Sequence, residues 1–178
     1  IDAYDAFFKK GEYSLDDLTR YAASLFFDGR YDEASNLINE GIAKDPNNFV
    51  LNRLLMYSAL EREDYTNGLT VADRFFSANK GDNEYIARDY ITYAKILSKN
   101  DQFDKAMQQY DLAIALDPNQ YDIYKEIAET LANSGETAKA GDYYKKYIDA
   151  AGEKAEALDF FNMGRYYYMA AGTAMKDT

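Results

Sequence analysis

The sequence contains no cysteine, no histidine and no tryptophan, and it has only two prolines. Disulfides and thiolate catalysis are therefore excluded, and the most common imidazole base and metal ligand is missing. The absence of cysteine is compatible with both an oxidising and a reducing compartment, so it does not decide location.

Long apolar runs and a basic charge balance are also missing. No uncharged apolar stretch reaches the roughly 18 residues that a membrane-spanning helix needs, so no membrane insertion is expected. The formal net charge of -11 argues against a general affinity for nucleic acid, because phosphate contacts need a basic surface. No phosphate-binding glycine motif or EF-hand loop occurs, and we expect neither a cofactor nor a metal.

What is present is a helical pattern, seen best in residues 87–120. Apolar residues recur there at helical spacing in two runs, which are separated by a polar break at residues 99–102. Pro118 then marks a stop and a restart. The stretch therefore predicts two amphipathic helices that pair as a hairpin. The residues on the predicted buried side are Tyr90, Tyr93, Ala94, Leu97, Ala106, Tyr110 and Ala113.

The same pattern repeats along the chain at intervals of about 34 residues. Frames start at Leu15, Phe49, Ala87, Tyr121 and Ala157. Counted within the frames, apolar or small residues recur at positions 4, 7, 8, 11, 20, 24 and 27, and position 32 is proline in two frames. The second frame is a weaker match, with Asn52 at position 4, and the fifth is only half present. In the second frame the large and small residues near the end are exchanged, with Ala72 at position 24 and Phe75 at position 27, so local repacking is expected there.

This pattern resembles the tetratricopeptide repeat family, a helix-turn-helix unit with these positions. The resemblance covers nearly the whole chain and implies an all-α fold, a right-handed α-solenoid of antiparallel helix pairs. Ankyrin repeats are disfavoured because their turn motif is absent. The RNA-reading pentatricopeptide repeats are disfavoured by the acidic balance and the proline at position 32.

We interpret residues 1–178 as a single array and as a fragment of a longer bacterial-type array. Its parts are the second helix of a preceding unit (1–14), repeat 1 (15–48), repeat 2 with an extended loop (49–86), repeat 3 (87–120), repeat 4 (121–156) and a partial repeat 5 (157–178). The chain starts at Ile1 rather than methionine, so an upstream targeting sequence is compatible with it, and the bacterial cytoplasm and periplasm both stay open.

The resemblance also implies that the first helices line a concave groove at positions 2, 5, 6, 9, 12 and 13. We expect this groove to bind a protein or peptide, including partners with acidic groups, as a non-catalytic scaffold or adaptor. The candidate partner-binding residues are Arg53, Tyr57, Arg88, Ile91, Lys95, Lys99, Lys125 and Arg165. The competing interpretation is that the aromatic residues pack into the core and the basic residues pair with acids across neighbouring helices.

Other functions are weighed against this one. The residues of the carboxylate clamp of chaperone-binding family members are not present at matching positions in repeats 1 to 4. Tyr57 and Tyr168 on the groove side leave carbohydrate binding, or an envelope-associated helper role, as the alternative. An enzyme would have to use carboxylates such as Glu126 and Glu129, which are three residues apart on one helix face.

Overall fold

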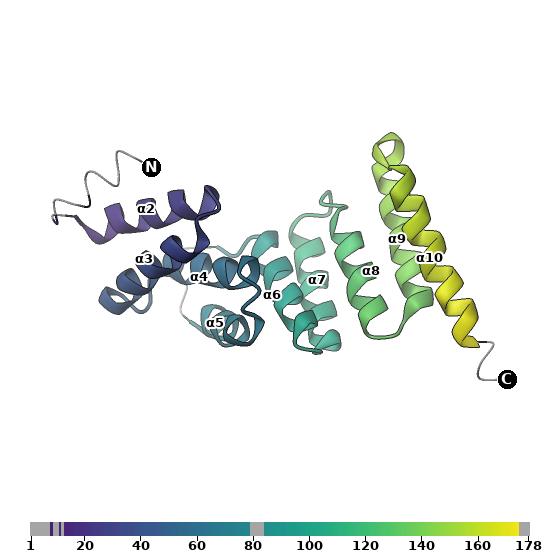
Figure 1. The fold of residues 1–178 in the computed structure, drawn as a ribbon, viewed down its shortest axis with the longest axis horizontal. Coiled ribbons are helices and arrows are strands. Elements are labelled where there is room, and N and C mark those ends of the chain that lie inside the picture. Colours follow the sequence, from purple (N-terminus) through teal and green to yellow (C-terminus); the bar gives the residue numbers. More distant parts are fainter. Residues whose placement is uncertain (1–7, 9–10, 12, 79–83, 175–178) are drawn as a thin grey trace. The chain divides into compact units, whose positions relative to one another are not determined.

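The computed structural model describes residues 8, 11, 13–78 and 84–174. Across these ranges the regular structure is helical, and none of them contains a β-strand. The chain divides into two compact units, Ile1–Glu84 and Tyr85–Thr178, each built from helices that pack in pairs (Figure 1). The all-α solenoid-type fold predicted from the sequence is thereby confirmed.

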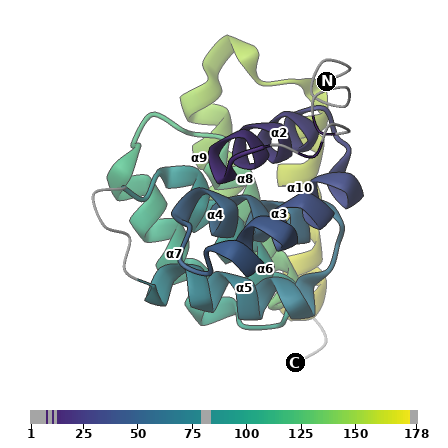
Figure 2. The same cartoon turned by 90° about the vertical axis from the view of Figure 1, so that its left-hand side faces the viewer.

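The first unit contains two hairpins. Helix α2 packs on α3, α3 on α4 and α4 on α5, and the two first helices α2 and α4 also touch. Both views place α2 and α5 at opposite sides of this unit with α3 and α4 between them (Figures 1 and 2). The helices are α2 (Leu15–Phe27), α3 (Tyr31–Lys44), α4 (Phe49–Glu61) and α5 (Tyr65–Ser77).

The second unit continues the same arrangement. Its hairpins are α6 with α7 and α8 with α9, and α10 packs along α9, as the succession from teal to yellow in Figure 1 shows. The first helices α6 and α8 also touch each other. The helices are α6 (Ala87–Lys99), α7 (Phe103–Leu116), α8 (Ile123–Asn133), α9 (Thr137–Ala151), the 3-10 turn η1 (Gly152–Lys154) and α10 (Ala157–Ala174).

A recurring turn closes each hairpin. The residue at position 15 of repeats 1 to 4 adopts positive φ, and the next N–H donates to the carbonyl of position 11, which satisfies a carbonyl at the end of the first helix. Glycine adopts this conformation without strain, whereas in an acidic residue the Cβ crowds the backbone and raises its energy. The four residues are Gly29 (φ 78°), Glu63 (57°), Asp101 (58°) and Gly135 (90°), followed by N–H···O distances of 2.9, 2.9, 2.9 and 2.8 Å.

Small residues allow the paired helices to approach. Ala34, Ala106 and Ala140, all at position 20 of their repeats, have no exposed surface. Gly41 marks an even closer approach, because a Cβ there would lie 2.5 Å from Cδ1 of Leu51 and 2.8 Å from Cδ2 of Leu18. The backbone of α3 therefore lies directly against side chains of α2 and α4.

The second repeat repacks locally, as the exchange of large and small residues predicts. Phe75 is 1 % exposed, and its ring lies 4.9 Å from that of Phe49. Ala72 has no exposed surface. The aromatic side chain has moved by one helical turn, and the ring of Phe49 fills the space beside it.

The fourth and fifth repeats depart from the predicted frame. Helix α8 begins at Ile123, two residues after the expected start, because a turn occupies the preceding positions. In α10 the expected buried residues Phe160 and Tyr167 are 52 % and 37 % exposed, and Tyr166 is buried instead. Tyr167 nevertheless packs on α9, because its ring lies against Gly141 and its hydroxyl donates to Oδ1 of Asp142 at 2.8 Å.

Two expectations fall wholly or partly outside the described residues. One is the helix expected over residues 1–14, most of which lies outside the described residues. The other is the loop between the second and third repeats, whose central part lies outside them. Among the helices that the structure does describe, none combines the length and apolarity that crossing a membrane requires.

Candidate partner-binding groove

Ion pairs join the successive first helices of the second unit. Lys95 of α6 lies 2.7 Å from Oε1 of Glu126 on α8, measured from its Nζ atom. One turn further along both helices, the Nζ of Lys99 lies 3.6 Å from Oε1 of Glu129. The first pair has hydrogen-bonding length and the second does not. Two predicted groove cations are thus directed at carboxylates of the neighbouring repeat.

The third pair, from α8 to α10, is the most buried. The Nζ of Lys125 lies 2.8 Å from Oδ1 of Asp159, whose side chain is 6 % exposed. The other oxygen of Asp159 accepts the N–H of Glu156 at 2.8 Å, which caps the start of α10. The Lys125 ammonium also lies 3.9 Å from the centre of the Tyr147 ring.

Both members of this pair stay charged. Burial opposes the charged form of Asp159, but the hydrogen bonds from Lys125 and from the Glu156 N–H outweigh it and lower the pKa of the carboxyl. Burial likewise acts to lower the pKa of Lys125, yet its hydrogen bond to Asp159 leaves that pKa raised. The two shifts agree in describing a stable ion pair.

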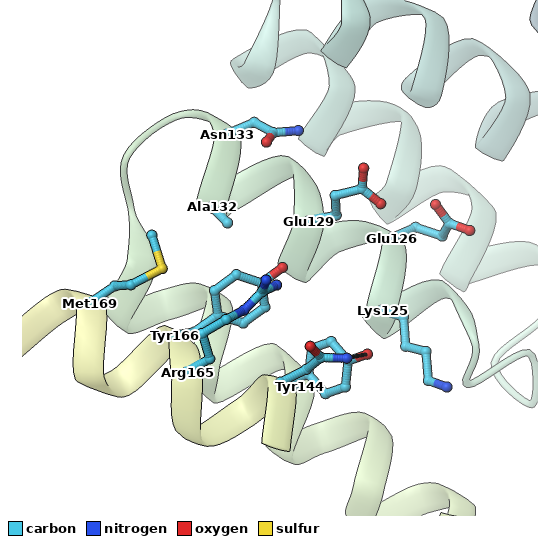
Figure 3. A pocket seen from close by; sticks show the side chains of 10 residues that line it. Lys125, Glu126, Glu129, Ala132, Asn133, Tyr144, Arg165, Tyr166 and Met169 are labelled. Carbon is cyan, nitrogen blue, oxygen red and sulfur yellow. Dashed lines mark hydrogen bonds between the residues drawn. The ribbon is translucent and has the colours of Figure 1, made fainter. Parts of the chain in front are cut away.

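A pocket of about 630 Å³ opens beside these pairs, between α8 and α10 (Figure 3). The side chains of Tyr144 and Tyr166 are buried at its base, with ring centres 5.9 Å apart. Its lining residues are Lys125, Glu126, Glu129, Ala132 and Asn133 from α8, Tyr144 from α9, and Asn162, Arg165, Tyr166 and Met169 from α10.

Two side chains on the α10 side of the pocket contact the tyrosines at its base. The amide nitrogen of Asn162 donates to the Tyr144 hydroxyl at 3.2 Å. The guanidinium carbon of Arg165 lies 5.1 Å from the centre of the Tyr166 ring. These contacts position an amide and a cation at the pocket before any ligand is present.

Comparisons with known proteins agree with this architecture. No protein-family model matches the sequence, and no curated protein matches it. A crystal structure of the C-terminal part of a TPR repeat-containing protein from Cytophaga hutchinsonii is 27% identical with a TM-score of 0.74. That match covers 86% of this chain and 58% of the other, so this chain spans less than two thirds of that structure. The fold is that of the tetratricopeptide-repeat proteins.

More distant structures share this fold. MamA from Desulfovibrio magneticus RS-1 is 17% identical with a TM-score of 0.69, over 80% of this chain and 78% of the other. YrrB, described as a TPR protein with an unusual peptide-binding site, is 15% identical with a TM-score of 0.72, over 95% of this chain and 84% of its own.

Within the tetratricopeptide frame, the two candidate residues of the first unit are engaged by their own unit. The Nη2 of Arg53 donates to the carbonyl of Glu84 at 2.7 Å, and its guanidinium carbon lies 4.7 Å from the centre of the Phe49 ring. Tyr57 is 5 % exposed and packs near Phe26, with ring centres 6.0 Å apart. Its ring is therefore part of the core rather than of an exposed sugar-binding surface.

The remaining candidates differ in their surroundings. Arg88 is exposed and lines a separate pocket of about 410 Å³ with Leu116 and Asp117. Ile91 is half-buried. Of the candidates, Lys125 and Arg165 line the pocket between α8 and α10. Lys95 and Lys99 do not line it, but they lie 2.7 and 3.6 Å from the pocket carboxylates Glu126 and Glu129.

Several pocket residues were not among the sequence candidates. Asn162, Asn133 and Met169 occupy positions that the family resemblance assigns to the groove, so the position rule alone would have found them. Tyr144 and Tyr166 form the base of the pocket from outside those positions. Their contribution depends on the packing of α9 against α10.

The carboxylates that an enzyme would need are engaged in ion pairs. Glu126 lies 2.7 Å and Glu129 3.6 Å from a lysine of α6, so these carboxylates face the neighbouring repeat. In the part of the chain that the structure describes, no group of three or more acidic residues is arranged to hold a metal ion.

Proposed function

We propose that this chain is a non-catalytic scaffold that binds a protein or peptide segment along the first helices of its second unit. The observation that carries the proposal is the pocket between α8 and α10, with its positioned amide and guanidinium groups over a base of two buried tyrosines. Amide side chains can pair with the main chain of a bound segment, and a cation can orient it.

The solved structures support this proposal at the level of the fold. YrrB is described as having a peptide-binding site, and it shares the fold with this chain. The paired lysines refine the sequence expectation, because Lys95 and Lys125 already contact carboxylates at 2.7 and 2.8 Å. A partner recognised by acidic groups alone would have to compete with these pairs.

The test is selection of displayed random peptides on the whole chain, followed by affinity measurement with two tryptophan variants. Ala132 lines the pocket, and Ala132→Trp should fill it and weaken the selected peptides by at least about tenfold. Ala138 is exposed on α9, and Ala138→Trp is the matched control that should leave binding unchanged. Equal affinity of both variants, or no peptide enriched at all, contradicts the proposal.

A further inference from the structure

The pocket between α8 and α10 carries four charged side chains that belong to two classes. Lys125 and Glu126 contact opposite charges at 2.8 and 2.7 Å. Their charge is balanced at hydrogen-bonding distance, so a ligand gains little from approaching them. They fix neighbouring first helices together rather than presenting charge to the pocket.

Arg165 belongs to the second class. It is exposed, and its contact among the described residues is with the neutral Tyr166 ring, not with a carboxylate. An exposed guanidinium of this kind can take a carboxylate through two parallel hydrogen bonds from its N–H groups.

Glu129 is the corresponding acid. Its nearest cation, Lys99, remains 3.6 Å away, and the Glu129 side chain is 58% exposed. A carboxylate in this state still accepts hydrogen bonds from an incoming donor. Asn133 of the same helix lines the pocket beside it.

Figure 3 shows Glu129 on α8 and Arg165 on α10, and both side chains line the same pocket. The lining also contains neutral side chains, among them Ala132, Met169, Tyr144 and Tyr166, while its other two charges, Lys125 and Glu126, are paired as described above. A ligand that matches this surface carries an acid and a base separated by neutral atoms.

Resting on the proposed function, we infer that the pocket recognises a mixed-charge peptide segment. An acidic side chain of the peptide binds Arg165, and a lysine or arginine of the same peptide binds Glu129. Asn162, fixed by Tyr144, contacts the peptide main chain between them. This partner narrows the expected one, a protein or peptide that can carry acidic groups, because Lys95 and Lys125 are paired within the chain at 2.7 and 2.8 Å.

The experiment is a pair of double-mutant cycles with a peptide selected on the wild-type chain. Arg165→Gln should weaken the peptide about tenfold, and should have no further effect when the acidic residue of the peptide is replaced by its amide. Glu129→Gln should weaken it about threefold, and that loss should vanish when the basic residue of the peptide is replaced by glutamine.

Lys146 provides the matched control. It is an exposed cation on α9 whose Nζ lies 4.0 Å from the Tyr143 ring centre, so Lys146→Gln removes a similar cation-ring contact away from the pocket. It should leave affinity unchanged. Circular dichroism of each variant checks that the helices are retained.

The outcomes separate the two proposals. Peptides that are blocked by Ala132→Trp but show no coupling to Arg165 or Glu129 overturn the mixed-charge inference and leave the binding function standing. Peptides that are not blocked by Ala132→Trp overturn both. Displacement of the peptide by free glutamate or lysine at equal concentration assigns a small zwitterion to the pocket and also overturns the inference.

Discussion

The two units join their successive first helices in different ways. In the first unit the contact between α2 and α4 includes aromatic rings, with Phe26 and Tyr57 both buried. In the second unit, ion pairs from α6 to α8 and from α8 to α10 span the same kind of junction. Dissolved salt screens exposed ion pairs, whereas an apolar contact carries no charge to be screened.

The difference teaches that one helical frame accepts two kinds of junction. The frame requires small residues between paired helices and leaves the groove-side positions free to vary. The ion-paired junctions of the second unit place polar side chains beside the pocket, whereas the aromatic junction of the first unit buries its rings. The binding proposal therefore falls on the second unit.

The largest expected effect tests what the units share. Ala34→Asp in the first unit and Ala106→Asp in the second both bury an unpaired charge at position 20, where the native side chains have no exposed surface. Each should cost about 3 kcal/mol of unfolding free energy or more, measured by denaturant melting. Ala138→Asp on an exposed site of α9 is the control. A loss in one unit only would mean that the shared frame is incorrect.

The next effect tests the most buried ion pair. Asp159→Asn removes the partner of Lys125 and weakens the cap of α10, and should cost about 1–2 kcal/mol because Lys125 is 35% exposed. The cost should be smaller for Glu126→Gln, whose pair is more exposed on the carboxylate side. Equal costs for the two variants would contradict the assigned burial.

The same aspartate gives a pH dependence. Because the pKa of Asp159 is lower in the folded chain than in the unfolded chain, the unfolded state binds the proton more readily. The stabilisation is complete above about pH 4 and is lost as the pH falls through the folded pKa. The difference in unfolding free energy between wild type and Asp159→Asn should therefore shrink on acidification. A difference that does not change with pH would contradict the pair.

A smaller effect is expected at the hairpin turns. Gly29→Ala and Gly135→Ala place a Cβ at positive φ and should each cost about 1 kcal/mol, whereas Glu63→Gly and Asp101→Gly should each stabilise by about 0.5 kcal/mol. Each unit holds one residue of each type, so thermal melting of the four variants checks whether the turns are equivalent. An opposite sign at Asp101 or Glu63 would show that the acid makes a compensating contact.

The smallest effect concerns salt. The coupling between Lys95 and Glu126, measured with alanine variants in a double-mutant cycle, should reach about 0.5–1 kcal/mol at low salt and fall at 0.5 M salt. The coupling between Phe26 and Tyr57 should keep its value over the same range. Equal salt dependence of the two couplings would remove the distinction between the junctions.

The sequence was sufficient to predict the helical pairs, because the buried residues of the frame depend on local spacing. It predicted the repacking around Phe75 for the same reason. The fifth repeat was predicted less well. There, Tyr166 is buried against Tyr144, while Tyr167 stays 37% exposed although its ring lies against Gly141 of α9.

The candidate site was predicted only in part. The groove position of Arg165 predicts that it lines the site, and it does. Lys95, Lys99 and Lys125 were predicted by the same rule, but each lies near an acid of a neighbouring repeat. Such pairing depends on the register between helices about 30 residues apart, which no local pattern specifies. The tyrosine base of the pocket was hidden for the same reason.

Methionine methyl NMR gives the most direct test of the binding site, because methionines lie in contrasting places. Met169 lines the pocket, Met107 lines a different one near the hairpin turns, and Met56 has no exposed surface in the first unit. On titration with a selected peptide, the Met169 methyl signal should shift while those of Met56 and Met107 stay in place. A shift at Met107 with Met169 unchanged would contradict the account.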